Sequence, residues 1–255
     1  MNIVRKHKGL FFYTATYLLT GILFFIPALM FPSLSFPLYL MSPAIIAFLM
    51  IAALEKTDGI KSFIRGLFLA GLQIKWMIIC TMFLPVGIVL ITNTLDNIIQ
   101  GQSFNYHSSA ISITPGFILM IAIGCIGEEI GWRGYLLPLL LKRHSSLLSS
   151  VLLGTLWGLW HAGDYGEGIG FLLFVVSTIA ISIIMTWLYH KNNGNILASV
   201  LFHFFYNISA SYVALIPETG MPSVTSRAIM AISCMIPAII LTLLSPVFRT
   251  KKLLK

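Results

Sequence analysis

The stretch that decides the fold is GFILMIAIGCIGEEIGWRGYLLPLLL, residues 116–141, in which two adjacent glutamates and an arginine interrupt an apolar run. Apolar residues continue on both sides of this charged trio, Glu128, Glu129 and Arg133. As a helix, the stretch is long enough to cross the roughly 30 Å hydrocarbon core of a bilayer. It therefore predicts a membrane-spanning segment that carries buried charge.

The composition indicates an integral membrane protein. Hydrophobic residues make up 58% of the 255-residue chain and charged residues only 9%, whereas a soluble domain carries roughly 25% charged residues. Cys80, Cys125 and Cys234 lie in separate apolar stretches, which argues against a disulfide framework. The sequence contains no Gly-rich phosphate loop, CxxC pair or nucleic-acid-binding module. We therefore expect the lipid bilayer, and no nucleic acid, as a partner.

Eight apolar segments follow one another, each near the length of a membrane span. They cover approximately residues 10–31, 37–54, 74–93, 115–141, 147–162, 170–189, 196–215 and 227–247. Helices are favoured because in lipid every backbone polar group needs an internal partner. The sequence predicts a single all-α domain over residues 1–255, a polytopic bundle of about eight transmembrane helices whose motif-bearing core covers about 115–215. Residues 55–71 mix charged and spaced apolar side chains and predict an interfacial amphipathic stretch.

The basic residues between these segments predict the orientation. Of the 16 lysines and arginines, all but Arg133 and Arg227 fall on one side of the membrane. These are Arg5, Lys6, Lys8, Lys56, Lys61, Arg65, Lys75, Lys142, Arg143, Lys191, Arg249, Lys251, Lys252 and Lys255. Cytoplasmic loops are enriched in Lys and Arg, so both termini are predicted to be cytoplasmic. The net charge of +8 then reflects topology and does not indicate an anionic partner.

A small set of polar side chains remains at depth. It consists of Glu128, Glu129, Arg133, His161, His203 and Asn207. A charged residue at mid-membrane costs roughly 2.5–3.5 kcal/mol on insertion scales, so we expect these groups to pair and face the bundle interior. Glu129 and Arg133 are four residues apart and share one helical face, whereas Glu128 is rotated by about 100°. The alternative is a buried ion pair that only fixes helix packing.

The histidines and the asparagine occupy two further segments. His161 closes the sequence WGLWH, residues 157–161, and His203 and Asn207 begin and end HFFYN, four residues apart on one face. Glu128 and His161 both lie roughly 20 Å from the cytoplasmic ends of their segments, and His203 is shallower; these depths allow one shared site but do not require it. An interfacial histidine and hydrogen bonding between helices are the structural alternatives.

A carboxylate, two imidazoles and an amide suit hydrolysis of an amide bond. A carboxylate shielded from bulk water binds protons more strongly, which makes it a better general base. Histidine and asparagine donors can orient water and stabilise an oxyanion. The sequence has neither a GxSxG nucleophile elbow nor the HExxH motif of soluble zinc peptidases.

The sequences EEIGWR, WGLWH and HFFYN match, in order, the motifs EExxxR, aromatic-xxxH and HxxxN over residues 128–207. The chain thereby resembles the CPBP family of intramembrane proteases, the CAAX-protease and bacteriocin-processing (Abi) proteins. The resemblance implies that Glu128 activates water, that His161, His203 and Asn207 hold the water and the oxyanion, and that Glu129 and Arg133 shape the site. Trp157 stands where relatives often have phenylalanine, a change expected to matter little.

The resemblance leaves the cofactor open, because relatives are described both as metalloproteases and as metal-independent glutamate peptidases. Zinc would be held by His161, His203 and Glu128, but Asn207 is a poor zinc ligand. We favour the glutamate-and-water mechanism, which requires no cofactor. The loop after His161, with Asp164 and Glu167, is expected to be solvated and without a chemical role.

The resemblance therefore implies an intramembrane endopeptidase in the plasma membrane of a prokaryote, cleaving a peptide or a membrane-associated protein. Bacteriocin maturation and self-immunity are possible roles of such a protein. One alternative is a proton-coupled transporter that relays protons through the buried Glu and His groups, although the paired internal repeats of many transporters are not found here. Another is a catalytically idle immunity protein.

Overall fold

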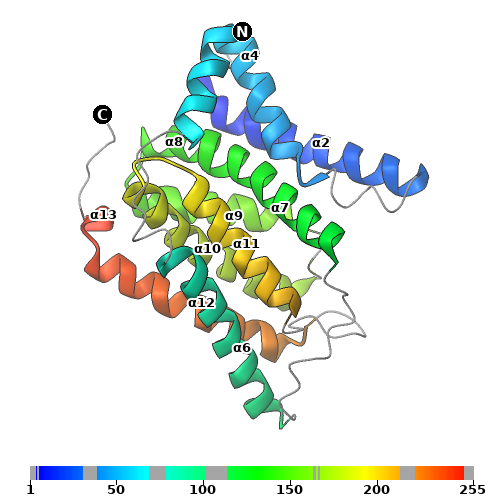
Figure 1. Cartoon of the computed structure of the whole chain (residues 1–255), viewed down its shortest axis with the longest axis vertical. Coiled ribbons are helices and arrows are strands. Elements are labelled where there is room, and N and C mark those ends of the chain that lie inside the picture. Colours follow the sequence, from blue (N-terminus) through cyan, green and yellow to red (C-terminus); the bar gives the residue numbers. More distant parts are fainter. Residues whose placement is uncertain are drawn as a thin grey trace.

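The computed structural model describes residues 4, 6–30, 39–68, 79–101, 114–162, 165, 167–212 and 222–249, and the elements within these ranges are helical (Figure 1). In chain order they are α2 (Lys8–Met30), α4 (Ser42–Phe68), η1 (Ile79–Phe83), α6 (Leu84–Gln100), α7 (Pro115–Glu129), η2 (Ile130–Leu136), α8 (Leu137–Leu141), α9 (Ser146–Trp160), α10 (Gly168–Lys191), α11 (Leu197–Tyr212), α12 (Val224–Leu244) and α13 (Pro246–Arg249). The elements η1 and η2 are π-helical.

The described helices form a multi-pass membrane bundle. By length and composition, four of them can cross a membrane: Cys80–Gln100, Pro115–Leu141, Gly168–Lys191 and Val224–Leu244. Two shorter apolar helices, Lys8–Phe24 and Ser146–Trp160, accompany them. The all-α prediction is confirmed for the described part of the chain. The number of about eight complete spans stays a prediction.

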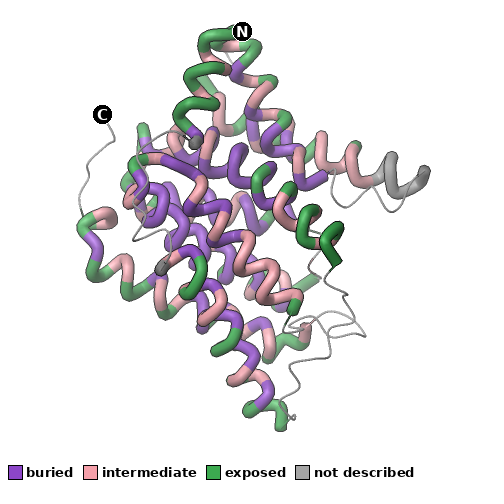
Figure 2. The backbone as a smooth tube through the Cα atoms, in the orientation of Figure 1, coloured by how far each residue is buried: buried purple, intermediate pink, exposed green. Residues whose placement is uncertain are grey.

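Helices α9 and α10 pack closely at the buried centre of the bundle (Figure 2). A Cβ atom at Gly154 would lie 2.6 Å from the Ile179 Cα, and one at Gly158 would lie 2.4 Å from the Thr178 Oγ1. Thr178 Oγ1 also donates a hydrogen bond to the Gly154 carbonyl oxygen at 3.2 Å. Small residues and hydroxyl groups at such contacts are typical of membrane helix pairs, since they let the backbones approach. This packing fixes α9, the helix that is followed directly by His161.

The predicted amphipathic stretch 55–71 is described up to residue 68 and forms the second part of α4. Lys56 breaks the helix with φ 58° and ψ −157°, and the chain is helical again after it. Leu67 is buried, while most of its neighbours in this part are exposed. The Leu67 carbonyl oxygen accepts a hydrogen bond from the Ile196 backbone N–H at 3.0 Å, just before α11 begins.

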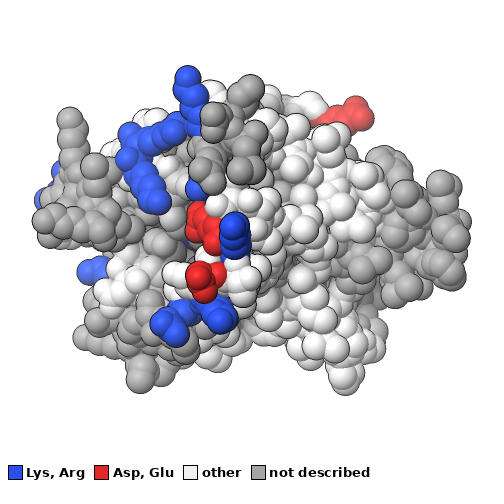
Figure 3. All heavy atoms as spheres, turned by 90° about the horizontal axis from the view of Figure 1, so that it is seen from above, with Lys and Arg blue, Asp and Glu red and all other residues white. Residues whose placement is uncertain are grey.

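Charged side chains gather in one area on the face of the molecule shown in Figure 3.

Candidate active site

The two glutamates end α7, and the chain continues directly into the π-helical η2. Such π-helical turns are frequent at functional sites. Gly131 in η2 lies against the start of α4, where an added Cβ atom would stand 2.3 Å from the Pro43 Cβ. Glu128 is only 3% exposed, and Glu129 and Arg133 are fully buried. The backbone therefore holds all three charged side chains inside the bundle.

Glu129 and Arg133 form the ion pair expected from their spacing. Arg133 Nη1 donates to Glu129 Oε1 at 2.9 Å, one helical turn away. His203 Nδ1 lies 3.0 Å from the same carboxylate oxygen, so α11 is tied to this pair. The Arg133 guanidinium also lies over the Trp157 ring, with Cζ 4.4 Å from the ring centroid. These extra partners offset more of the desolvation cost of the two buried charges than an isolated ion pair would.

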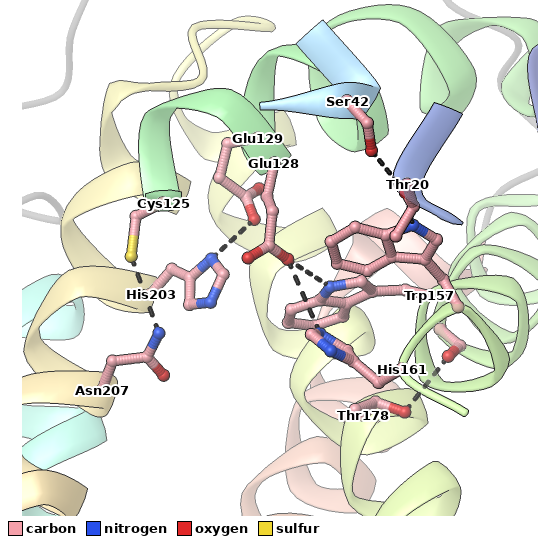
Figure 4. A network of polar contacts seen from close by, with 12 residues as sticks. Thr20, Ser42, Cys125, Glu128, Glu129, Trp157, His161, Thr178, His203 and Asn207 are labelled. Carbon is pink, nitrogen blue, oxygen red and sulfur yellow. Dashed lines mark hydrogen bonds and ion pairs between the residues drawn. The ribbon is translucent and has the colours of Figure 1, made fainter. Parts of the chain in front are cut away.

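Glu128 meets the end of α9, whereas Glu129 meets His203 of α11 (Figure 4). Trp157 Nε1 donates a hydrogen bond to Glu128 Oε2 at 2.7 Å. His161 Nε2 lies 3.8 Å from the same oxygen. That distance is too long for a direct hydrogen bond. One carboxylate oxygen is thus held by an indole N–H next to a histidine.

Asn207 lies one turn after His203 on α11. Its amide Nδ2 is 3.7 Å from Cys125 Sγ, and Cys125 is one turn before Glu129 on α7 (Figure 4). The predicted site therefore has two halves: Glu128 beside His161, and Glu129 beside His203. The motifs alone predicted one set of residues around Glu128, and the structure gives His203 to the other glutamate.

A cavity of about 260 Å³ joins the two halves. Its wall includes Glu128, His161, His203 and Asn207, together with Cys125. Most of the remaining wall is aromatic or aliphatic. Among the described residues that line the cavity, Glu128 is the only carboxylate. Glu129 and Arg133 are not among the lining residues. A substrate in this cavity would meet one carboxylate, two imidazoles, one amide, the Cys125 thiol and the Arg227 guanidinium.

The placed side chains do not form a zinc site. Within the described ranges, no three His, Cys, Asp or Glu residues are grouped to hold a metal ion. Of the zinc ligands considered from the sequence, Glu128 and His161 are neighbours, but His203 turns its Nδ1 to Glu129. A three-ligand site typical of catalytic zinc would need these side chains to rearrange. We derive no chemical step through zinc.

The sequence analysis missed the part played by Trp157. A phenylalanine at this position would pack similarly but has no N–H for the Glu128 carboxylate, so the tryptophan adds a contact that the motif did not predict. The available signal was its position four residues before His161, on the same helical face. In the loop after His161, Glu167 is exposed and its side chain makes no capping hydrogen bond to α10. Asp164 lies outside the described residues.

Comparisons with known proteins point to one family. The family model described as "Type II CAAX prenyl endopeptidase Rce1-like" matches residues 110–209, a range that contains all six predicted site residues. A curated protein of Methanococcus maripaludis named "CAAX prenyl protease 2" is 30% identical over 254 residues, covering 88% of this chain and 93% of the relative. The similarity thus extends well beyond the three motifs.

Proposed function

Because the chain belongs to the Rce1-like family of type II CAAX prenyl endopeptidases, which are intramembrane proteases, we propose that it hydrolyses a peptide bond in the cavity lined by Glu128 and His161. The observation that carries this proposal is the Glu128 carboxylate, buried at the cavity wall and held by the Trp157 N–H at 2.7 Å. A buried, oriented carboxylate beside a histidine is suited to act as a general base.

The proposed reaction begins with a water molecule between Glu128 and the scissile carbonyl. Glu128 accepts a proton from this water while the water oxygen bonds to the carbonyl carbon. The resulting oxyanion is stabilised by donors from His203 and Asn207, whose side chains line the same cavity. The proton is then delivered to the amide nitrogen as the C–N bond breaks, giving a free carboxylate and a free amine. His161, 3.8 Å from Glu128, helps to orient the water.

Glu129 and Arg133 are proposed to act through His203. The Glu129 carboxylate lies 3.0 Å from His203 Nδ1 and thereby fixes the orientation of the ring. With its Nδ1–H directed to Glu129, the ring can donate to the oxyanion from Nε2 only in the imidazolium form. Arg133 in turn holds Glu129 at 2.9 Å. The ion pair is therefore a positioning device for the imidazole and not itself a reacting group.

The proposed substrate is a peptide or a membrane-associated protein, processed in the plasma membrane of a prokaryote by an enzyme with cytoplasmic termini. The name of the Methanococcus maripaludis relative specifies a prenylated CAAX sequence. We extend to this chain the peptide-bond hydrolysis and treat prenylation as a variable to be tested. Bacteriocin maturation or self-immunity would use the same hydrolysis on a different peptide. The transporter alternative is dropped, because the family consists of endopeptidases.

The decisive experiment compares the wild-type protein with Glu128→Ala in nanodiscs, using fluorogenic peptides with and without a prenyl group. We expect Glu128→Ala to lower the cleavage rate by about 10²–10⁴-fold, the usual contribution of a general base. Glu167→Ala is the matched control, since it removes an exposed carboxylate in the loop before α10 and should cleave normally.

Two outcomes would contradict the proposal. Equal cleavage by the wild-type protein and Glu128→Ala would remove Glu128 as the base. Loss of activity with a chelator, restored by zinc, would replace the metal-free mechanism by one in which a metal activates the water. Cleavage that continues in the chelator and stops in Glu128→Ala would support the mechanism as written.

A further inference from the structure

Lysines and arginines gather in one area of the face shown in Figure 3, and the proposed mechanism does not use them. Three segments supply basic side chains to this part of the molecule: the start of α2, the bend of α4 with the helix after it, and the residues after α8. The same segments carry two acidic residues, Glu55 and Asp58, so positive charge predominates. We call this area the basic surface, and its described members are Lys6, Lys8, Lys56, Lys61, Arg65, Lys142 and Arg143, all exposed except the partly exposed Lys8.

Direct contacts join the three segments. Lys8 Nζ pairs with Glu55 Oε1 at 3.2 Å, which ties the start of α2 to the bend of α4. Arg143 Nη2 donates to the Lys6 carbonyl oxygen at 3.3 Å, which ties the residues after α8 to those before α2. Topology accounts for the side of the membrane on which basic residues lie. It does not require that they assemble, so the assembled surface calls for a partner of its own.

The part of α4 after Lys56, residues 57–68, has the pattern of a helix that lies at a membrane surface; we call it the α4 arm. Its apolar side chains recur at helical spacing: Ile60, Phe63, Ile64 and Leu67. Leu67 is buried, whereas Ile64 is 46% exposed. The helical period places Lys61 and Arg65 next to the exposed Ile64 side of this apolar stripe. Exposed apolar and basic side chains next to each other fit the boundary between acyl chains and headgroups.

The bundle holds the α4 arm in a fixed position. Lys56 turns the chain with φ 58°, a backbone conformation that is uncommon for lysine. Phe63 of the arm then packs edge to face on Phe48, with ring centroids 5.5 Å apart. Leu67 lies so close to Gly134 of η2 that an added Cβ atom there would collide with Leu67 Cδ2. These contacts direct the Leu67 side of the arm to the protein and leave its Ile64 side outside.

We propose that the basic surface, with the α4 arm at its centre, binds the anionic phospholipid headgroups of the leaflet that it faces. Clusters of roughly four to eight Lys and Arg residues beside a membrane helix or on an amphipathic helix are typical of such binding. Arg65 can hold a phosphate through two parallel N–H···O bonds. An acidic peptide in solution would also match the charge, but it would leave Ile64 in water, whereas a lipid covers this side chain with acyl chain. The partner is therefore a lipid of the surrounding bilayer, whichever peptide the cavity accepts.

The test measures which lipid collects at the arm. Ser62→Cys, an exposed position of the arm, is labelled with bimane in phosphatidylcholine nanodiscs that contain a minor share of spin-labelled phosphatidylglycerol or spin-labelled phosphatidylcholine. We expect quenching by the anionic lipid to be at least about twofold stronger than quenching by the neutral lipid. Lys61→Gln with Arg65→Gln should reduce this ratio to about one. The matched control, Lys191→Gln with Arg249→Gln, removes two basic residues outside the basic surface and should leave the ratio unchanged.

Two further measurements define the cause of the preference. Lys61→Arg with Arg65→Lys keeps both charges and should keep the ratio. Salt at about 1 M shortens the screening length to roughly 3 Å and should bring the ratio near one. The chain without Ser62→Cys gives the background from any label on Cys80, which is partly exposed.

Other results overturn the proposal. Equal quenching by both lipids with the arm intact would show that no anionic lipid collects there. An unchanged ratio in Lys61→Gln with Arg65→Gln, or an equal fall in the control, would assign the attraction to the charge of the whole molecule. A fall in the charge-keeping variant as large as in the neutral one would show that the two residues only support the arm. Loss of the preference on addition of glycerol phosphate in low salt would identify free phosphate as the ligand in place of lipid.

Discussion

Trp157 is the side chain that connects the parts of the candidate site. Its indole N–H binds Glu128, its ring lies under the Arg133 guanidinium, and His203 packs on it edge to face at 5.2 Å. Trp157→Phe would keep a ring for the arginine and the histidine but remove the donor. Hydrogen bonds to charged groups contribute about 1.5–3 kcal/mol. We therefore expect kcat to fall about 10–100-fold, with little change in KM, in steady-state peptide cleavage.

Trp160→Phe provides the matched control for this prediction. Trp160 is also buried on α9 and its Nε1 donates a hydrogen bond of the same length, 2.7 Å, but to the Thr20 hydroxyl. Trp160→Phe should lower the stability of the protein about as much as Trp157→Phe does, while kcat stays near the wild-type value. If the two substitutions lower kcat equally, the Trp157 bond is structural and does not serve Glu128.

The residue contacts differ in how far the sequence could predict them. The Glu129–Arg133 pair follows from four-residue spacing on one helix, so it was predictable. The contact of His203 with Glu129 joins two helices, and the rotation of each is set by packing that the motifs do not encode. The same holds for Trp157 and Glu128, where close contact of α9 with α10 at Gly158 fixes the indole. Motif matching therefore selected side chains that lie close together in the structure, but it did not give their pairing.

Among the helices, the continuous run α7–η2–α8 has the most to do with the site. The sequence predicted one long segment, 115–141, interrupted by glycines and Pro138, and the structure keeps it as one candidate span. The π-helical turns of η2 were not predicted. Within them Gly131 fits against Pro43 of α4, a tertiary contact with no local signature in the sequence, and we infer that this contact supports the π-helical turns. Local pattern gave the length of this element, and packing against α4 gave its shape.

Gly131→Ala tests this dependence. An added Cβ atom would stand 2.6 Å from the Pro43 carbonyl carbon, which is backbone and cannot rotate away. Overpacking of this kind costs typically 1–3 kcal/mol. We expect a lower midpoint in thermal unfolding, together with reduced cleavage, because η2 follows directly after Glu129. Gly87→Ala in α6 is the control, since no atom lies within 4 Å of its added Cβ; it should be neutral or stabilise the helix by up to about 1 kcal/mol. Equal midpoints for the two variants would contradict the role given to Gly131.

The molecule as a whole presents apolar side chains on its outside. Leu119, Ile169 and Leu244 are each more than half exposed, at 61%, 63% and 71%, as expected for helices that face lipid. The composition was sufficient to predict this class of fold, because a bilayer accepts few others. It was not sufficient to count the spans, since α9 is short and α4 turns sharply at Lys56. The positive φ of Lys56, which produces this turn, cannot be predicted from a hydropathy pattern.

The orientation of the bundle in the membrane decides which substrates can reach it. The distribution of basic residues predicts that Lys142, at the end of α8, faces the cytoplasm and that Ser223, which caps α12 next to Arg227, faces the opposite side. Lys142→Cys and Ser223→Cys replace exposed residues, so a membrane-impermeant maleimide can report both positions. In intact cells we expect labelling of Ser223→Cys alone, with Lys142→Cys labelled only after permeabilisation.

The unmodified chain serves as the background: Cys125 and Cys234 are buried, and any labelling of the half-buried Cys80 is subtracted. The reverse labelling pattern would invert the predicted topology. The result also bears on the substrate, since Pro222, next to Ser223, lines the cavity. If Ser223→Cys is labelled from outside, this end of the cavity lies at the outer surface, where an exported peptide can enter. If it is labelled from inside, the same end of the cavity is open to a cytoplasmic protein.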